Sequence, residues 1–484
     1  MCGIIGLYHS KKPAAREIYD GLIQLQHRGQ DAAGISTMDS SKIHLHKNLG
    51  LVTEVFKTNN SIDILKGTIG IGHVRYPTAG SHDIHDSQPF YTANPVNIAL
   101  AHNGTLVNSE NLRNELIKTH FCQFNTSSDS EVLLNLFAFE LYKTKFVKLS
   151  KTHIFKALNE VYKRCSGGFS VVALVSGIGI VAFRDHHGIR PLSIGRNKDS
   201  YMISSESSAL SSMEFELLRD IAPGEAIIIG LDGKIFKRRI SGHLKNMPCL
   251  FEFVYFSRPD SYIDSISVHK ARLRMGDYLG DKILKDFPNL GIDVVIPVPD
   301  TSRTSAMQVA FKLGVKYREG FMKNRYIGRT FIMPKQKARK RSVKQKLNPI
   351  EIEFKDKRVM LVDDSIVRGH TSKKIVEMVK SCGAKKVFFA SASPPIKYQN
   401  IYGIDMPATS ELIAHGRSIK EVKSYIKADE LIYQELEDLK RAATKGNPKI
   451  KEFEDSVFTG NYKVGKVSKK YLSDLESNRS NLLN

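Results

Sequence analysis

Cysteine follows the initiator methionine directly in the opening Met1-Cys2-Gly3. Removal of the methionine would leave a thiol and a free α-amine on the same residue, Cys2. Such an amine has an unperturbed pKa of about 7.7 to 8, so it can take the proton of a thiol whose pKa is about 8.5. The motif therefore indicates an N-terminal nucleophile, although a buried structural cysteine would fit these three residues equally well.

Polar residues in the first half of the chain suit a glutamine pocket. Glutamine presents a carboxylate for Arg75, an ammonium for Asp129, and a carboxamide that Cys2 can attack. The tetrahedral intermediate then needs hydrogen-bond donors, which the Asn103 side chain and the Gly104 backbone N–H can supply. Each residue also has a plainer interpretation as a turn, an ion-pair partner or a helix cap. Only the combination predicts glutamine hydrolysis; the segments involved are 27–35, 73–80, 102–104 and 128–131.

A second run with chemical potential covers residues 359–372, where an apolar stretch leads into two acids and a loop rich in glycine and hydroxyl groups. Ligands of α/β proteins bind beyond the carboxyl ends of parallel strands, where Asp363 and Asp364 could hold ribose hydroxyls and a magnesium ion. The N–H groups that follow suit a phosphate, with Thr371 and Ser372 adding hydroxyl donors. Two solvated acids at the end of a strand would explain only part of this pattern.

The elements that must position these residues differ between the two halves of the chain. Short apolar runs interspersed with helical patterns predict an α+β fold for the first half, whereas strict alternation of strand and helix predicts a parallel sheet for the second. The basic stretch 234–248 is the predicted boundary. The predicted strands are 70–75, 96–102, 170–176, 179–184, 201–205, 226–229, 294–297, 359–362 and 387–392, and the predicted helices are 14–26, 128–142, 302–313, 371–382 and 429–443.

Length and composition narrow the class of protein. A chain of 484 residues with 41% hydrophobic and 25% charged residues is typical of two or three folded domains. The five scattered cysteines form no CxxC pair, which argues against a disulfide framework and a zinc site and favours a reducing compartment. Without a signal-peptide pattern or an apolar run of membrane-spanning length, we expect a cytoplasmic protein with no membrane partner.

One segment carries almost half of the net charge of +22, and the remainder is spread along the chain. Between Lys323 and Lys346 the chain has ten Lys or Arg and no acid. No aromatic-interleaved RNA or DNA motif accompanies this charge, so we expect no nucleic-acid partner. A loop that orders over an anionic substrate would account for it, and a solvated charged loop is the plain alternative.

The first half resembles the class II glutamine amidotransferase domain, which has the N-terminal nucleophile (Ntn) hydrolase fold, an αββα sandwich. The resemblance rests on Cys2 and the four polar segments and places this domain at residues 2–240. It implies that Cys2 is the nucleophile and that Arg75 and Asp129 bind glutamine. It also implies that Asn103 and Gly104 form the oxyanion hole.

The run 359–372 resembles the signature of α/β type I phosphoribosyltransferases, whose paired acids hold the ribose of phosphoribosyl pyrophosphate (PRPP). His370 stands where that family usually has threonine, and no role is assigned to it. The resemblance implies a Mg²⁺ site formed by Thr301, Asp363 and Asp364. The implied PRPP-binding residues are Asp363, Asp364, Ser365, Gly369, Thr371, Ser372, Lys323 and Arg329.

Both signatures on one chain, with the run 249–261, resemble the glutamine phosphoribosylpyrophosphate amidotransferase family. The resemblance implies a phosphoribosyltransferase domain at 250–470, a polar tail at 471–484, and internal transfer of ammonia from glutamine to PRPP at the first committed step of purine synthesis. It further implies feedback inhibition by purine nucleotides and a homotetramer. One subgroup has a propeptide and an iron–sulfur cluster; Cys2 follows Met1 and only two cysteines lie beyond residue 240, so we expect no cluster.

Other functions compete with this interpretation. Related enzymes pair the same front domain with a sugar-isomerase or an ATP-pyrophosphatase module, but neither explains the residues from Asp363 to Ser372. A non-catalytic DNA-binding regulator with a phosphoribosyltransferase fold would suit the basic charge. It would have no need of Cys2, Arg75 and Asn103.

Overall fold

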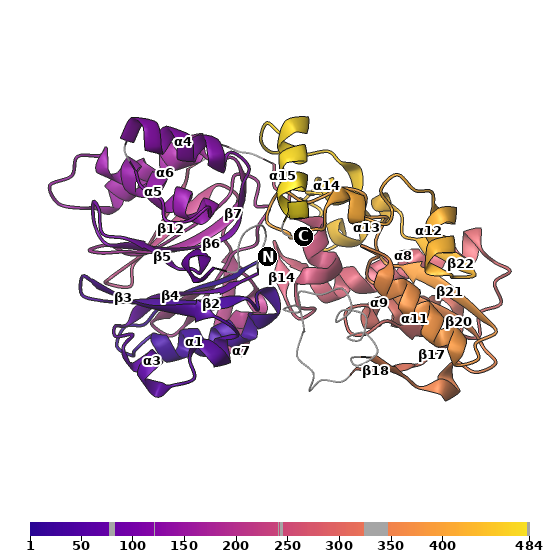
Figure 1. The fold of residues 1–484 in the computed structure, drawn as a ribbon. Coiled ribbons are helices and arrows are strands. Elements are labelled where there is room, and N and C mark those ends of the chain that lie inside the picture. The colour runs from indigo at the N-terminus through magenta and orange to yellow at the C-terminus, as the bar shows by residue number, and fades with distance from the viewer. Residues whose placement is uncertain (77–82, 121, 241, 243–244, 324–346, 482–484) are drawn as a thin grey trace.

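The structure is a computed structural model that describes residues 1–76, 83–120, 122–240, 242, 245–323 and 347–481. The chain forms two sheet-bearing units that lie side by side, with the N-terminus between them (Figure 1). We call them the first unit and the second unit in chain order.

Two antiparallel sheets packed face to face build the first unit. Helices cover the outer face of each sheet, so strands such as β1 are buried along their whole length and read as continuous apolar runs (Figure 1). The predicted αββα sandwich is therefore confirmed. One sheet has the order β11 (Glu216–Asp220), β9 (Ser193–Asn197), β10 (Ser200–Ser204), β1 (Gly3–Tyr8), β4 (Ile69–Arg75), β2 (Ala32–Asp39), β3 (Lys42–Leu49). The other has the order β13 (Ile235–Arg239), β12 (Glu225–Gly230), β8 (Gly179–Arg184), β7 (Gly167–Val175), β6 (Ile98–Leu106), β5 (Phe90–Thr92).

The helices of the first unit fall into two groups. One group packs on the sheet that contains β1, and the other packs on the sheet that contains β6. The first group is α1 (Ala15–Gln24), α2 (Val52–Val55), α3 (Asn59–Asp63) and α7 (Ser207–Ser212), and the second is α4 (Ser109–His120), α5 (Asp129–Tyr142) and α6 (Lys151–Arg164).

The second unit is built on a five-stranded parallel sheet, as predicted from the alternation of strands and helices. Helices cover both faces, with α8 and α9 packed on one side and α11 and α12 on the other. The strand order is β17 (Lys316–Tyr317), β16 (Val294–Pro297), β20 (Arg358–Asp363), β21 (Lys386–Ser391), β22 (Glu430–Tyr433). The helices are α8 (Val268–Asp286), α9 (Arg303–Leu313), α11 (His370–Ser381), α12 (Ile419–Ile426) and α13 (Leu436–Thr444).

Smaller elements complete the second unit. A π-helical turn, Glu252–Phe256, begins it, and two short hairpins follow. The hairpins are β14 (Tyr262–Ile263) with β15 (Ile266–Ser267) and β18 (Phe321–Lys323) with β19 (Leu347–Pro349). The chain closes with α14 (Ser456–Thr459) and α15 (Lys469–Asn481).

One prediction about the elements was wrong. The helix expected at 429–443 is strand β22 followed by helix α13, because residues Glu430–Tyr433 extend the parallel sheet beside β21. The predicted boundary stretch 234–248 begins with strand β13, which pairs with β12 and belongs to the first unit. In the predicted tail from residue 471, the described residues are helical through Asn481, and Leu472 and Leu475 pack against the apolar cluster between the units.

Buried side chains of both units meet at their junction. Met1 and Ile189 of the first unit lie in one apolar cluster with Phe253 and Tyr402 of the second. Buried ion pairs also cross the junction: Glu252 pairs with Arg28 and with Arg190, and Asp264 pairs with Arg184. In the described residues, the two units therefore share one apolar core and are joined by buried ion pairs.

Candidate functional site

Cys2 lies immediately before the central strand β1, whose neighbour β4 ends at Arg75. The register pairs Gly3 with Val74, which places Cys2 at the end of β4. The Cys2 backbone N–H donates to Asn103 Oδ1 at 3.2 Å, and the thiol donates to the Tyr76 carbonyl at 3.8 Å. Two separate sheets thus converge on the predicted nucleophile.

Asn103 and Gly104, the predicted oxyanion donors, lie next to each other in β6. The Asn103 amide oxygen accepts from Cys2, so its Nδ2 donor is left over; this atom is buried and has no hydrogen-bond partner among the described residues. Gly104 has φ +145°, and a Cβ there would lie 2.0 Å from the Gly168 carbonyl oxygen. Only glycine fits this backbone conformation and this close approach.

Arg75 and Asp129 border the same region. Asp31 and Asp86 hold the Arg75 guanidinium at 3.3 and 3.4 Å. Asp129 is the first residue of α5 and accepts from the Leu106 backbone N–H at 2.9 Å, which fixes its carboxylate at the end of β6. Asp86 also lines a cavity of about 250 Å³ whose other walls are residues 83, 85 and 124–127. The structure thus groups all five predicted glutaminase residues around the ends of β1, β4 and β6.

The predicted PRPP acids lie at the carboxyl end of β20, in the middle of the parallel sheet. Burial and the neighbouring charge of Asp364 raise the pKa of Asp363 well above its ordinary value. Burial raises the pKa of Asp364 to about 6, against hydrogen bonds from Ser365 and Thr301 and the charge of Arg272. Ser365 Oγ donates to Asp364 at 2.7 Å. A cation would relieve the repulsion between these two acids.

The loop after the acids leads into helix α11 as predicted. Gly369 precedes the helix with φ +73°, and Thr371 and Ser372 lie in its first turn. His370 is exposed, and its Nδ1 and the Tyr425 hydroxyl form a hydrogen bond of 2.6 Å. The imidazole is thus held against α12.

The basic segment is only partly described. Lys323, in β18, forms an ion pair with Asp300, which follows β16. Lys323 thus stands beside the strand end that carries Thr301. Arg329 and the remainder of the predicted loop up to residue 346 lie outside the described residues.

The described residues contain no group of three or more His, Cys, Asp or Glu side chains that could hold a metal by themselves. The oxygen donors available are Asp363, Asp364 and the Thr301 hydroxyl, which bonds to Asp364. A set of two acids and one hydroxyl fits Mg²⁺ that completes its shell with water and substrate phosphates. No helix in the described ranges is long and apolar enough to span a membrane.

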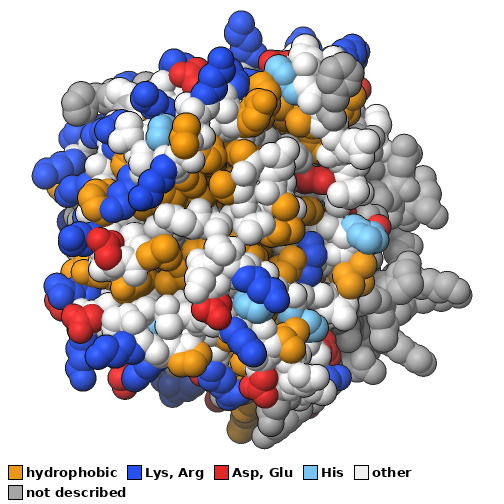
Figure 2. All heavy atoms as spheres, turned by 90° about the vertical axis from the view of Figure 1, so that its left-hand side faces the viewer, with side chains coloured by type: hydrophobic (Ala, Val, Ile, Leu, Met, Phe, Trp, Pro, Cys, Tyr) orange, Lys and Arg blue, Asp and Glu red, His pale blue; other side chains and the backbone are white. Residues whose placement is uncertain are grey.

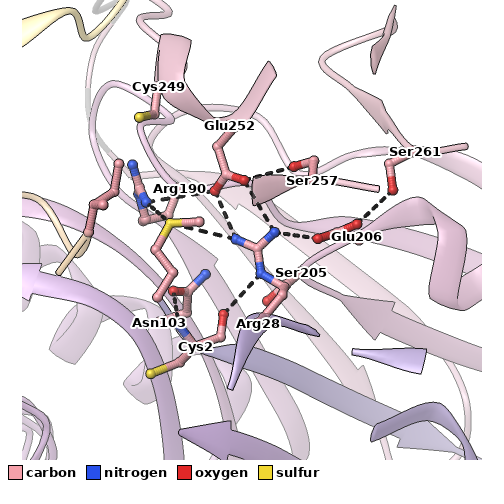
Figure 3. A network of polar contacts seen from close by, with 12 residues as sticks. Cys2, Arg28, Asn103, Arg190, Ser205, Glu206, Cys249, Glu252, Ser257 and Ser261 are labelled. Atoms are coloured by element: carbon pink, nitrogen blue, oxygen red, sulfur yellow. Dashed lines mark hydrogen bonds and ion pairs between the residues drawn. The ribbon is translucent and has the colours of Figure 1, made fainter. Parts of the chain in front are cut away.

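A buried polar network next to Cys2 was missed by the sequence reasoning (Figure 3). Arg28 donates to the Cys2 carbonyl through Nε at 3.1 Å and pairs with Glu206 and Glu252. Arg28 belongs to a polar segment that the sequence had singled out, but its partners lie 178 and 224 residues away along the chain. No local pattern signals such pairs.

Basic side chains on the outer end of the first unit are scattered. Figure 2 shows Lys and Arg spread over this face among acidic, apolar and neutral side chains. The part of the charge excess visible here forms no single patch of the kind that nucleic-acid binding requires.

Comparison with known proteins covers both units. A family model described as a glutamine amidotransferase domain matches residues 77–212, and one described as a phosphoribosyl transferase domain matches residues 263–400. The amidophosphoribosyltransferase of Pseudomonas aeruginosa is 53% identical over 99% of this chain and 96% of its own length. That of Escherichia coli is 50% identical with the same coverage. A solved structure of glutamine PRPP amidotransferase from B. subtilis, complexed with ADP and GMP, superposes with a TM-score of 0.85 at 36% identity, over 97% of this chain and 98% of that one.

Proposed function

Since this chain belongs to the amidophosphoribosyltransferase family, we propose that Cys2, freed of Met1, releases ammonia from glutamine and that Asp363 and Asp364 hold the PRPP that receives it. The reaction converts glutamine, PRPP and water to 5-phosphoribosylamine, glutamate and pyrophosphate. It is the first committed step of purine biosynthesis.

In the glutamine half-reaction the thiol of Cys2 attacks the carboxamide carbon. The α-amine accepts the thiol proton, and the intermediate's oxyanion takes hydrogen bonds from Asn103 Nδ2 and the Gly104 N–H. Ammonia leaves, a thioester remains on Cys2, and water then hydrolyses it to glutamate. Arg75 and Asp129 bind the substrate's α-carboxylate and α-ammonium. The observation that carries this assignment is the buried, unpaired Asn103 donor beside Cys2.

In the second half-reaction ammonia attacks C1 of the ribose while pyrophosphate leaves. Asp363 and Asp364 accept hydrogen bonds from the ribose hydroxyls, and the N–H groups around Gly369 with the hydroxyls of Thr371 and Ser372 hold the 5′-phosphate. We propose that Lys323 and Arg329 contact the pyrophosphate. Thr301, Asp363 and Asp364 would hold Mg²⁺, which when bound neutralises charge on the pyrophosphate.

Further features of the family are proposed for this chain. Purine nucleotides would inhibit it, because the related B. subtilis enzyme binds ADP and GMP. We propose a homotetramer in the cytoplasm that lacks an iron–sulfur cluster. The scattered free thiols support both the compartment and the missing cluster, since a four-cysteine site needs its ligands together.

A single substitution tests the two-site proposal. Cys2→Ala should abolish synthesis of phosphoribosylamine from glutamine, because the thioester cannot form. Synthesis from ammonium salts should continue, because the second site is untouched. Pyrophosphate and glutamate release would be measured with glutamine, PRPP or both. Equal loss of both activities would refute the proposal.

A further inference from the structure

We propose that Glu252, which belongs to the second unit, is a positioning residue for the Cys2 nucleophile of the first unit and acts through Arg28. The inference rests on the proposed role of Cys2. It adds a residue outside the glutaminase unit to the glutaminase site.

The backbone of Cys2 is held by two side chains. Its N–H donates to Asn103 Oδ1 at 3.2 Å, and its carbonyl accepts from Arg28 Nε at 3.1 Å. Once Met1 is removed, the residue has only one covalent neighbour, Gly3. The direction of the thiol then depends on these two hydrogen bonds and on its own contact with the Tyr76 carbonyl at 3.8 Å.

The guanidinium of Arg28 is fixed by carboxylates from both units (Figure 3). Glu206 of the first unit accepts from Nη1 at 2.5 Å. Glu252 of the second unit accepts from Nη2 at 2.8 Å and from Nη1 at 3.2 Å. All three side chains are almost completely shielded from solvent, so each charge depends on the others for compensation.

Glu252 is itself firmly placed. Ser257 Oγ donates to its carboxylate at 2.7 Å, and Arg190 lies 3.7 Å from it. Burial alone would raise the pKa of Glu252, but the charges of Arg28 and Arg190 lower it below the ordinary value. Neutralising this carboxylate would leave the two guanidiniums facing each other, and Arg28 would shift toward Glu206 and away from the Cys2 carbonyl.

The chain contains a matched pair that separates positioning from simple stability. Arg184 of the first unit and Asp264 of the second form an equally buried, bidentate ion pair across the same junction, at 2.8 and 2.9 Å. Among the described residues, no hydrogen bond or ion pair of Arg184 or Asp264 reaches Cys2. Loss of either carboxylate removes one buried charge from the junction, but only loss of Glu252 disturbs Arg28.

The experiment compares Glu252→Gln with Asp264→Asn in the full-length, processed enzyme. Glutamine hydrolysis, ammonia-dependent synthesis and the unfolding midpoint would be measured for each. For Glu252→Gln we expect kcat of glutamine hydrolysis to fall roughly ten- to a hundredfold with KM for glutamine changed less than about threefold. Ammonia-dependent synthesis by Glu252→Gln should stay within about twofold of the parent. Asp264→Asn should lower the unfolding midpoint about as much as Glu252→Gln does, but its kcat of glutamine hydrolysis should fall less than about threefold.

Glu252→Asp serves as a second variant, because it restores the charge and should recover part of the lost kcat. Unchanged kcat in Glu252→Gln, or equal loss of kcat in Asp264→Asn, would overturn the inference. Failure of the proposed function is distinct, because it would show as glutamine hydrolysis that survives Cys2→Ala. If Glu252→Gln does not fold, the comparison of Glu252→Asp with Asp264→Glu decides by the same criteria.

Discussion

The side chain of Asn103 presents two different groups to the glutamine site. Its oxygen must face Cys2 because the Cys2 N–H needs an acceptor, which turns the Nδ2 donor toward a place where the described residues offer no partner. A buried donor without a partner costs stability. Its retention is explained if the oxyanion of the intermediate is the partner, because the donor is then paired during catalysis.

Asn103→Ala should therefore slow glutamine hydrolysis far more than it weakens glutamine binding. We expect kcat to fall on the order of a hundredfold, the cost of removing one oxyanion donor. Ammonia-dependent synthesis serves as the internal control and should be unaffected. A rise in KM at constant kcat would instead assign Asn103 to ground-state binding.

Asp220 is a second residue whose surroundings make a measurable prediction. It ends β11 at the junction, and burial together with the charge of Asp264 raises its pKa to about 6. Since the folded pKa exceeds the ordinary 3.8, its contribution to stability is complete below 3.8 and is lost as the pH rises through about 6. The Asp220→Asn variant has no carboxylate at this position, so its stability should not fall in this way as the pH rises.

The difference in unfolding midpoint between the parent and Asp220→Asn would be measured at about pH 4.5 and about pH 7.5. Between about pH 4.5 and about pH 7.5, the free energy of unfolding of the parent should fall relative to that of Asp220→Asn by on the order of 2 kcal/mol. Comparison at matched pH cancels the carboxylates common to both proteins. A difference that is constant across this range would contradict the assigned pKa.

Residues of the site were predictable from the sequence where their chemistry is displayed locally. Cys2 after Met1, the Asn103-Gly104 pair and the two acids after an apolar strand each carry a recognisable pattern. The structure brings Cys2, Asn103 and Gly104 together, because the residue before β1 is hydrogen-bonded to a residue of β6. Glu252 gave no such signal, because its partner Arg28 is 224 residues away and nothing near it in the sequence requires a buried charge.

At the scale of elements, prediction succeeded where the hydrophobic pattern decides the structure. Strands β8 and β16 match their predicted ranges because each is an apolar run bounded by turn residues. The range 429–443 failed because its amphipathic spacing continues through Glu430–Tyr433, whereas pairing with β21 draws those four residues into the sheet. Tertiary pairing overrode a local helical preference there.

Gly403, in the loop before α12, lies against Gly104 of strand β6, and a substitution can test this contact. Gly403 of the second unit has φ +107°, and a Cβ there would lie 2.7 Å from Gly104 Cα and 3.0 Å from Gly104 C. Gly403→Ala should therefore displace the backbone of the oxyanion donor. We expect glutamine hydrolysis to fall roughly tenfold or more, with ammonia-dependent synthesis retained.

Gly416→Ala provides the control for this substitution. Gly416 also has a positive φ, +66°, but a Cβ there would meet nothing within 4 Å. Alanine at Gly416 adopts the left-handed region at a cost of roughly 1 kcal/mol, whereas φ +107° at Gly403 costs alanine more, so the unfolding midpoint of each variant is measured beside its activity. Equal glutaminase activity in the two variants would show that the Gly104 contact is unimportant.

At the scale of the whole molecule, residues of both units meet at the proposed glutaminase site. The first unit supplies Cys2 and Asn103, while the second places Glu252 behind Arg28 and Gly403 against Gly104. The fold class was predictable from the sequence, and so was the grouping of the candidate residues, because each group belongs to one unit. The contacts at the junction were not predictable, since they join residues that are neighbours only after both units have folded.

Arg272, on α8, acts on both the junction and the proposed PRPP loop. Its guanidinium donates to the carbonyls of Phe253 and Ser257 at 2.9 and 2.8 Å, and so braces the π-helical turn that carries Glu252. Its charge also opposes the rise in the pKa of Asp364 that burial causes. We therefore expect the charge at Asp364 and the support of Glu252 to be linked through Arg272.

Arg272→Lys keeps the charge but replaces the planar fork, which reaches the carbonyls of Phe253, Tyr255 and Ser257 through two separate nitrogens, by a single ammonium group. We expect glutamine hydrolysis to become uncoupled from synthesis, so that glutamate release exceeds pyrophosphate release when PRPP is present, whereas the parent releases them equally. Arg274→Lys is the matched control, because Arg274 lies on the same helix and donates instead to Ala442 O at 3.2 Å in α13. Equal release of both products from Arg272→Lys, at whatever rate, would mean that Arg272 supports the fold without linking the sites.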